Sequence, residues 1–177
     1  MIMRTSRIPL EYYGWLVLAV PLTFLVHEFA HWLAGEWLGY TMHMTLNGAS
    51  AAGGQFRSVS DEALVSAAGP LITIAQGLIA FWLVRSRAWI QAYAFLFVAW
   101  FMRFAAAVVS VVHPNDEARI SQILGAGTWT VPVIVVLALL ALVWSASRRI
   151  KVGWKANLAS YLICSVAVAV VVLLDAR

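Results

Sequence analysis

The sequence predicts an all-α, polytopic membrane protein with about five transmembrane helices and a short strand-like hairpin (about 41–56) after the first. The chain is 63% hydrophobic and 11% charged, whereas soluble domains are about 45–50% apolar and about 25% charged. Five apolar stretches approach or exceed the roughly 20 residues that cross a bilayer. These stretches lie at about 12–38, 63–84, 88–112, 129–147 and 156–174.

Little sequence lies outside these stretches, so we expect one domain over residues 1–177, with a core at about 12–120 and accessory helices at about 129–174. Eight basic residues fall on one side of the predicted spans and three on the other. Because positively charged connections stay in the cytoplasm, we expect a cytoplasmic N-terminus, in a bacterial or archaeal cell membrane. The eight are Arg4, Arg7, Arg85, Arg87, Arg148, Arg149, Lys151 and Lys155, and the three are Arg57, Arg119 and Arg177.

The first predicted span contains the pattern H-E-x-x-H, from His27 through Glu28 to His31. Residues four apart share one face of a helix, so both imidazoles can reach the same metal ion. Two such histidines with a neighbouring glutamate are typical of zinc metalloproteases, in which the glutamate is the general base. Ionisable groups inside a membrane span are costly and usually functional. We therefore predict His27 and His31 as ligands of one catalytic Zn²⁺ and Glu28 as the catalytic base.

Residues 41–46 alternate polar and apolar side chains, and Asn47-Gly48 is a hairpin turn signal. Such a strand could pair with an extended peptide. The pattern alone favours an ordinary hairpin at the membrane surface, because short strands are ambiguous.

The remaining spans contain few polar signals. In the second, Ala67-Ala68-Gly69-Pro70 indicates close helix packing. In the third, Arg103 lies 13 residues before Asp116, about 20 Å along a helix. We therefore interpret Arg103 as a buried structural partner rather than a group that contacts substrate. Spans four and five have no ionisable residue well inside the membrane and are interpreted as scaffold, with Cys164 as a small buried side chain.

A catalytic zinc usually has three protein ligands, and the topology restricts the third. Spans one and three both end at the same membrane face, which brings the turn at 113–117 to the depth of His31. Asp116 is our predicted third ligand, with His113 and then Glu117 as alternatives. Glu36 lies about 140° around the helix from His31 and should point away. The acids Asp61 and Glu62 are interpreted as helix-start residues.

These motifs together resemble the site-2 protease family of intramembrane zinc metalloproteases. After His31 the family tends to place Ala and Gly where this chain has Ala34 and Gly39, followed by a Gly-containing strand-like segment. Its next span carries an Ala-Gly-Pro signature, matched by 68–70, and a later span ends in an Asp ligand, matched in position by Asp116. The resemblance covers roughly residues 15–120.

Three positions depart from the family pattern. Ala30 and Thr73 stand where Gly and Asn are common, and Asp116 follows Pro114-Asn115 rather than lying in Leu-Asp-Gly. Many members place the zinc toward the cytoplasm, whereas the charge count here places it toward the opposite face. No peptide-binding or nucleotide-sensing module is visible, so a regulatory protein would be a separate chain.

The sequence therefore favours a zinc metalloendopeptidase that cleaves a transmembrane or membrane-inserted protein substrate, with the lipid bilayer as its surroundings and no nucleic-acid partner. The alternative is a non-catalytic metal-binding homologue that binds transmembrane segments, although binding alone does not need Glu28. A transporter or metal channel is a third hypothesis. It predicts ionisable residues along a path through the membrane, and spans four and five offer none.

Overall fold

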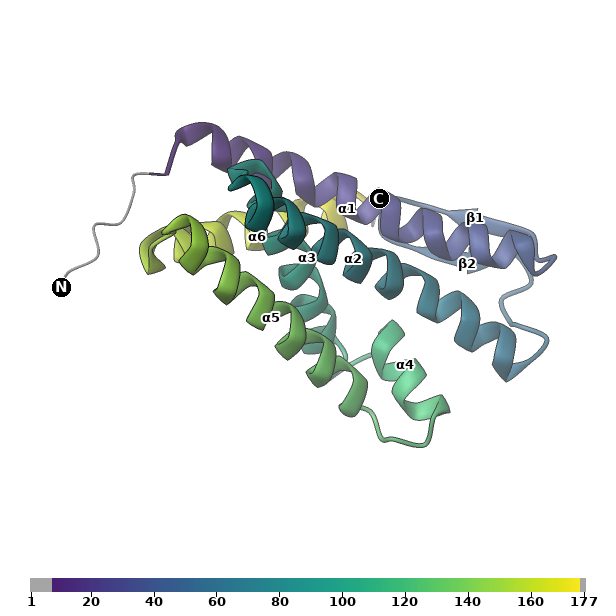
Figure 1. Ribbon diagram of the computed structural model, residues 1–177. Helices are drawn as coiled ribbons and strands as arrows, with labels where there is room; N and C mark the ends of the chain where they lie inside the picture. Colours follow the sequence, from purple (N-terminus) through teal and green to yellow (C-terminus); the bar gives the residue numbers. More distant parts are fainter. Residues whose placement is uncertain (1–7, 176–177) are drawn as a thin grey trace.

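The computed structural model describes residues 8–175 and is a helical bundle with one small antiparallel sheet (Figure 1). Five of its helices are long and apolar enough to cross a membrane, as the sequence predicts. Many large apolar side chains on their outer faces are exposed, which suits a nonpolar surrounding. The five are α1 (Leu10–Trp37), α2 (Val59–Arg87), α3 (Ile90–Val109), α5 (Thr130–Ile150) and α6 (Trp154–Asp175).

The long helices begin and end at recognisable signals. The N-terminus of α2 follows Ser58, whose hydroxyl accepts a hydrogen bond from the backbone N–H of Asp61. Asp61 and Glu62 lie in the first turn, as predicted for helix-start acids. At the end of α1, Gly39 has a φ of 81°, a conformation that glycine adopts without steric cost. This residue lets the chain reverse direction toward the sheet.

The hairpin after α1 is shorter than the predicted segment. Strands β1 (Met42–Met44) and β2 (Ala49–Ala51) pair antiparallel, with His43 opposite Ser50. The N–H of Thr45 donates to the carbonyl of Gly48 across the turn, at 2.8 Å. Hydrogen bonds to two acidic side chains fix this hairpin to the helices. Glu36 accepts from the N–H of Met42 at 2.8 Å, and Asp175 at the end of α6 accepts from Leu46 N–H at 3.0 Å.

A sixth helix, α4 (Asp116–Ile123), occupies the segment for which the sequence predicted only a turn. The chain leaves α3 at Ser110, and α4 packs against α2 and α5. Two hydrogen bonds from Asn115 tie the connection back to α3. Its N–H donates to the Ser110 hydroxyl at 3.1 Å and its side-chain amide donates to the Ala106 carbonyl at 3.2 Å. Asp116 therefore begins a helix whose direction is set by this turn.

Helix α3 lies at the centre and contacts α1, α2, α5 and α6. The apolar core fills the end of the bundle at which α1 begins, and its largest fully buried side chains include Tyr12, Tyr93, Leu16 and Leu96. The buried tyrosines have polar partners, as buried hydroxyls require. The Tyr12 hydroxyl lies 2.9 Å from the Ser160 hydroxyl. The other half of the bundle contains the buried charged residues.

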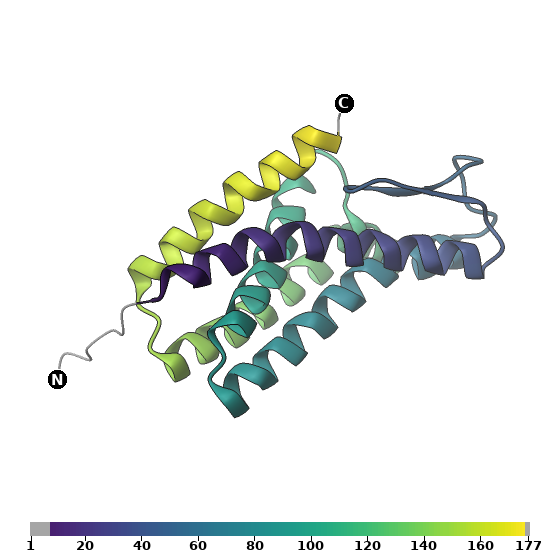
Figure 2. The same cartoon turned by 90° about the horizontal axis from the view of Figure 1, so that it is seen from above.

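The two ends of the bundle differ in charge, as the sequence predicts. The α2–α3 and α5–α6 connections lie at the end where α1 begins, whereas the hairpin and α4 lie at the other end (Figures 1 and 2). Arg85, Arg87, Arg148 and Arg149 occupy the last turns of α2 and α5. Arg57 and Arg119 lie at the opposite end, while Arg4, Arg7 and Arg177 are outside the described residues.

Candidate metal centre

Helix α1 directs His27 and His31 toward the interior, where their residues are 4% and 6% exposed. The two Nε2 atoms lie 3.1 Å apart, so the i, i+4 spacing brings both imidazoles to one point as predicted. His27 lies 10 residues before the end of α1 at Trp37, about 15 Å along the helix axis. Phe24 and Glu28 flank the pair, and Glu28 is also buried.

Asp116 completes this pair, as predicted. Its Oδ2 lies 3.2 Å from His27 Nε2 and 3.3 Å from His31 Nε2. The three side chains form a group that could hold a metal ion. Asp116 reaches the two histidines because the turn between Ser110 and Asn115 reverses the chain and points the first residue of α4 back at α1.

The hydrogen bonds behind the imidazoles indicate which ring nitrogens face the centre. His31 Nδ1 lies 2.6 Å from the Val65 carbonyl, which can only accept. His27 Nδ1 lies 3.0 Å from the Thr73 hydroxyl, and this hydroxyl donates its own proton to the Gly69 carbonyl. Both Nδ1 atoms must therefore be donors, so each neutral imidazole presents an unprotonated Nε2. Three acceptor atoms then face one another, which requires a shared cation: an additional proton or a metal ion.

The geometry and charge of the site fit a divalent metal. Ligand bonds of about 2.0–2.1 Å in a tetrahedral zinc site place neighbouring ligand atoms about 3.3–3.4 Å apart. The three separations here are 3.1, 3.2 and 3.3 Å. The centre also gathers three carboxylates, of Glu28, Asp116 and Glu117, against one buried guanidinium, that of Arg103. With the partly exposed Arg119, which lies 3.5 Å from Asp116 Oδ1, the group has a formal excess of one negative charge, and this favours a bound cation in a low-dielectric interior.

The surroundings of Asp116 favour the ionised form of its carboxyl, which a metal ligand requires. Burial raises the pKa of its carboxyl, but a shared proton that makes His27 or His31 a cationic donor to Oδ2 outweighs burial and holds the pKa well below its usual range. A metal ion at the same point would act in the same sense. Arg119 Nη2 lies 3.5 Å from Oδ1 of the same carboxylate. Oδ2 is thus directed at the imidazoles while Oδ1 faces a partly exposed cation.

Glu28 lines a cavity of about 360 Å³ together with the two histidines and Asp116. Among the described residues, no hydrogen bond or ion pair occupies its carboxylate. A free carboxylate beside a metal site is suitably placed to accept a proton from water. The cavity walls also include the hairpin turn (Asn47, Gly48, Ala49) and apolar side chains of α3 and α6 (Met102, Val109, Val168, Val172).

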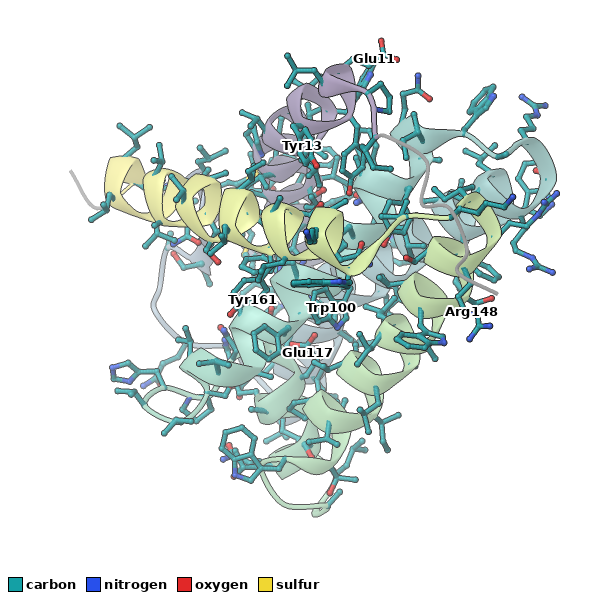
Figure 3. All side chains as sticks on the ribbon, turned by 90° about the vertical axis from the view of Figure 1, so that its left-hand side faces the viewer. Glu11, Tyr13, Trp100, Glu117, Arg148 and Tyr161 are labelled. Atoms are coloured by element: carbon teal, nitrogen blue, oxygen red, sulfur yellow. The ribbon has the colours of Figure 1, made fainter. Side chains whose placement is uncertain are left out.

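The other predicted candidates lie away from the centre or have different partners. His113 is exposed in the connection before α4. Glu117 instead pairs with Arg103 at 3.0 Å, and Figure 3 shows Glu117 in the interior while Glu11 and Arg148 lie at the periphery. Glu36 points away from the centre, as predicted, and binds the N–H of Met42.

Two residues, Arg103 and Gly69, lie closer to the His27–His31–Asp116 centre than the sequence indicated. The prediction that Arg103 lies about 20 Å from Asp116 is wrong, because α3 ends at Val109 and the chain turns back. Arg103 Nη1 lies 3.9 Å from Asp116 Oδ2. Gly69, interpreted as a helix-packing residue, directly faces both imidazoles. A Cβ at Gly69 would lie 2.7 Å from His27 Nε2 and would also meet His31. The Gly-Pro pattern was the only signal for this role.

We expect Asp116→Ala to lower metal affinity by more than about 100-fold, because loss of an outer-shell partner alone typically costs about 10–100-fold. His113→Ala is the matched control and should leave the affinity unchanged, since His113 is exposed outside the cluster. Zinc titration of each purified variant against a competing chelator measures its zinc affinity. A weakened His113→Ala variant beside a normal Asp116→Ala variant would reverse the assignment.

Searches against protein-family models, curated proteins and solved structures gave no match to this chain.

Proposed function

We propose that this protein is an intramembrane zinc metalloprotease that hydrolyses peptide bonds of membrane-spanning or membrane-inserted proteins. The observation that supports it most is the convergence of His27, His31 and Asp116 beside Glu28, which lines the same cavity. A structural metal site needs no unoccupied carboxylate at its edge. The resemblance of the motif set to site-2 proteases points in the same direction.

Different residues of this chain perform different steps of the proposed reaction. A zinc ion held by His27, His31 and Asp116 would supply a Lewis acid toward water and the substrate carbonyl. Glu28 removes a proton from the attacking water and later delivers it to the nitrogen of the leaving amine. Thr73 and the Val65 carbonyl keep the imidazoles in the tautomer and orientation that a metal needs.

The location of the cavity supports a membrane substrate. His27 and His31 lie on α1, which is long and apolar enough to span a bilayer, and Asp116 begins α4, which follows the candidate span α3. A transmembrane helix hides its carbonyls in internal hydrogen bonds, so it must unwind before hydrolysis. Residues 41–46 could pair with the unwound segment, although their pattern alone favoured an ordinary hairpin. The hairpin residues that reach the cavity are instead Asn47, Gly48 and Ala49, so we assign substrate contact to the turn and the start of β2.

The alternative function is a metal-binding protein that holds transmembrane segments without cleaving them. Removal of the metal distinguishes the protease from the non-catalytic binding protein. The zinc-loaded protein, reconstituted in liposomes with a panel of fluorescently labelled single-span peptides, should cleave at least one of them. Chelation should stop cleavage and added zinc should restore it. Binding of the same peptides without any product, at full zinc occupancy, would support the non-catalytic alternative and contradict the protease proposal.

A further inference from the structure

We propose that Arg103 donates a hydrogen bond to the carbonyl oxygen of the peptide bond being cleaved, and so stabilises the negative charge that develops there. This inference rests on the proposed protease function. It assigns a substrate contact to a residue whose sequence context indicated only a structural partner.

Arg103 lies beside the metal-binding triad of His27, His31 and Asp116. Arg103 lies on α3, is 4% exposed and lines the same cavity as Glu28 and the metal-binding triad. Its Nη1 is 3.9 Å from the Asp116 oxygen that faces both imidazoles. A peptide carbonyl that reaches this triad would therefore come close to the guanidinium.

The guanidinium of Arg103 has more hydrogen-bond donors than partners. A guanidinium has five N–H donors. Nη1 donates to Glu117 at 3.0 Å, whereas Nε is buried and has no hydrogen-bond partner among residues 8–175. Buried donors without partners are rare and call for an explanation. The ion pair with Glu117 holds the side chain in place through Nη1, and the guanidinium keeps N–H groups from which no described residue accepts.

The chemistry needs such a donor. As the water oxygen bonds to the carbonyl carbon, the carbonyl π electrons move onto the carbonyl oxygen and Glu28 takes the water proton. When the C–N bond breaks, these electrons re-form the carbonyl and Glu28 protonates the departing nitrogen, leaving a carboxylic acid and an amine. A positioned cationic donor acts mainly while the oxygen bears negative charge, so its contribution should be larger in the transition state than in substrate binding.

The test compares Arg103→Lys with Glu117→Gln. Both substitutions alter the same ion pair, but only the first changes the proposed donor, and lysine keeps a positive charge beside Glu117. We expect Arg103→Lys to lower kcat by about 100-fold, as loss of one oxyanion donor typically does. KM and zinc affinity should stay near the wild-type values. Glu117→Gln should retain most of the activity, because its amide oxygen still accepts from Nη1.

A binding measurement accompanies the kinetics. A phosphinic analogue of a cleaved peptide, which carries tetrahedral anionic oxygens, should bind zinc-loaded Arg103→Lys about 100-fold more weakly than wild type, in proportion to kcat. The same analogue should bind Glu117→Gln normally. If Arg103→Lys does not fold, the double variant Arg103→Gln/Glu117→Gln, which removes both charges of the ion pair together, takes its place.

Equal losses in Arg103→Lys and Glu117→Gln would mean that the ion pair only holds α4, and would overturn the proposal. Unchanged kcat and analogue affinity in Arg103→Lys would overturn it too. A wild-type protein that cleaves none of its bound peptides would instead refute the proposed function itself. The two failures are therefore distinguishable.

Discussion

Glu28→Gln should lower cleavage of a membrane-inserted peptide by about 10²–10⁴-fold, the usual contribution of a general acid–base residue. Glutamine has nearly the same size and can fill the same place at the cavity wall, but it cannot take a proton from water. Because Glu28 is not a member of the His27–His31–Asp116 group that could hold a metal ion, zinc should remain bound with unchanged stoichiometry. The measurements are product formation in liposomes and metal content per protein.

Glu11→Gln is the matched control for this experiment. It makes the same chemical change on the same helix, but Glu11 lies exposed in the first turn of α1, away from the cavity. Its cleavage rate should equal that of the wild type. Cleavage by Glu28→Gln at the wild-type rate would contradict the assigned mechanism. Loss of zinc along with activity would instead assign Glu28 a role in holding the metal.

Gly69→Ala should strongly weaken metal binding, and cleavage with it, although alanine adds only one methyl group. The added Cβ would lie 2.5 Å from His27 Cε1 and 2.7 Å from His27 Nε2, and it would also meet His31 Nε2. Real Cβ atoms do not approach other atoms so closely, so the rings or α2 must move. The imidazoles cannot swing freely, because Thr73 and Val65 hold them from behind. We expect zinc affinity to fall by more than about 100-fold, beyond the usual effect of an outer-shell change.

Gly14→Ala separates this effect from the general consequence of replacing glycine in a helix. A Cβ at Gly14 meets nothing within 4 Å, and alanine favours a helix by about 1 kcal/mol over glycine. This variant should bind zinc normally and unfold at an equal or higher temperature. Normal zinc binding by Gly69→Ala would mean that α2 does not pack against the imidazoles as described.

The features that local sequence determines were predictable. Long apolar stretches must cross the membrane as helices, because a helix satisfies its own backbone hydrogen bonds, and all five spans appear near the expected positions. The i, i+4 spacing of His27 and His31 guarantees a shared helix face wherever the helix packs. The alternating direction of the five spans likewise predicted which connections share an end of the bundle.

The choice of the third member of the cluster was only partly predictable. Topology placed residues 113–117 at the right face, but three candidate side chains lie within that turn. The direction of each depends on where α4 begins and on the two hydrogen bonds of Asn115 to α3. With Asp116 as the first residue of α4, its side chain points at the imidazoles, while Glu117 points at Arg103 and His113 faces outward.

The sequence by itself determined a five-span membrane protein with a paired-histidine motif and an adjacent glutamate, because both depend on the periodicity and hydrophobicity of single helices. Only the tertiary structure decided that Asp116 joins the histidines, that Gly69 leaves room for their rings and that Arg103 lies beside them. These contacts depend on how α1, α2, α3 and α4 pack together, and residues far apart in the chain carry no local signal of such packing.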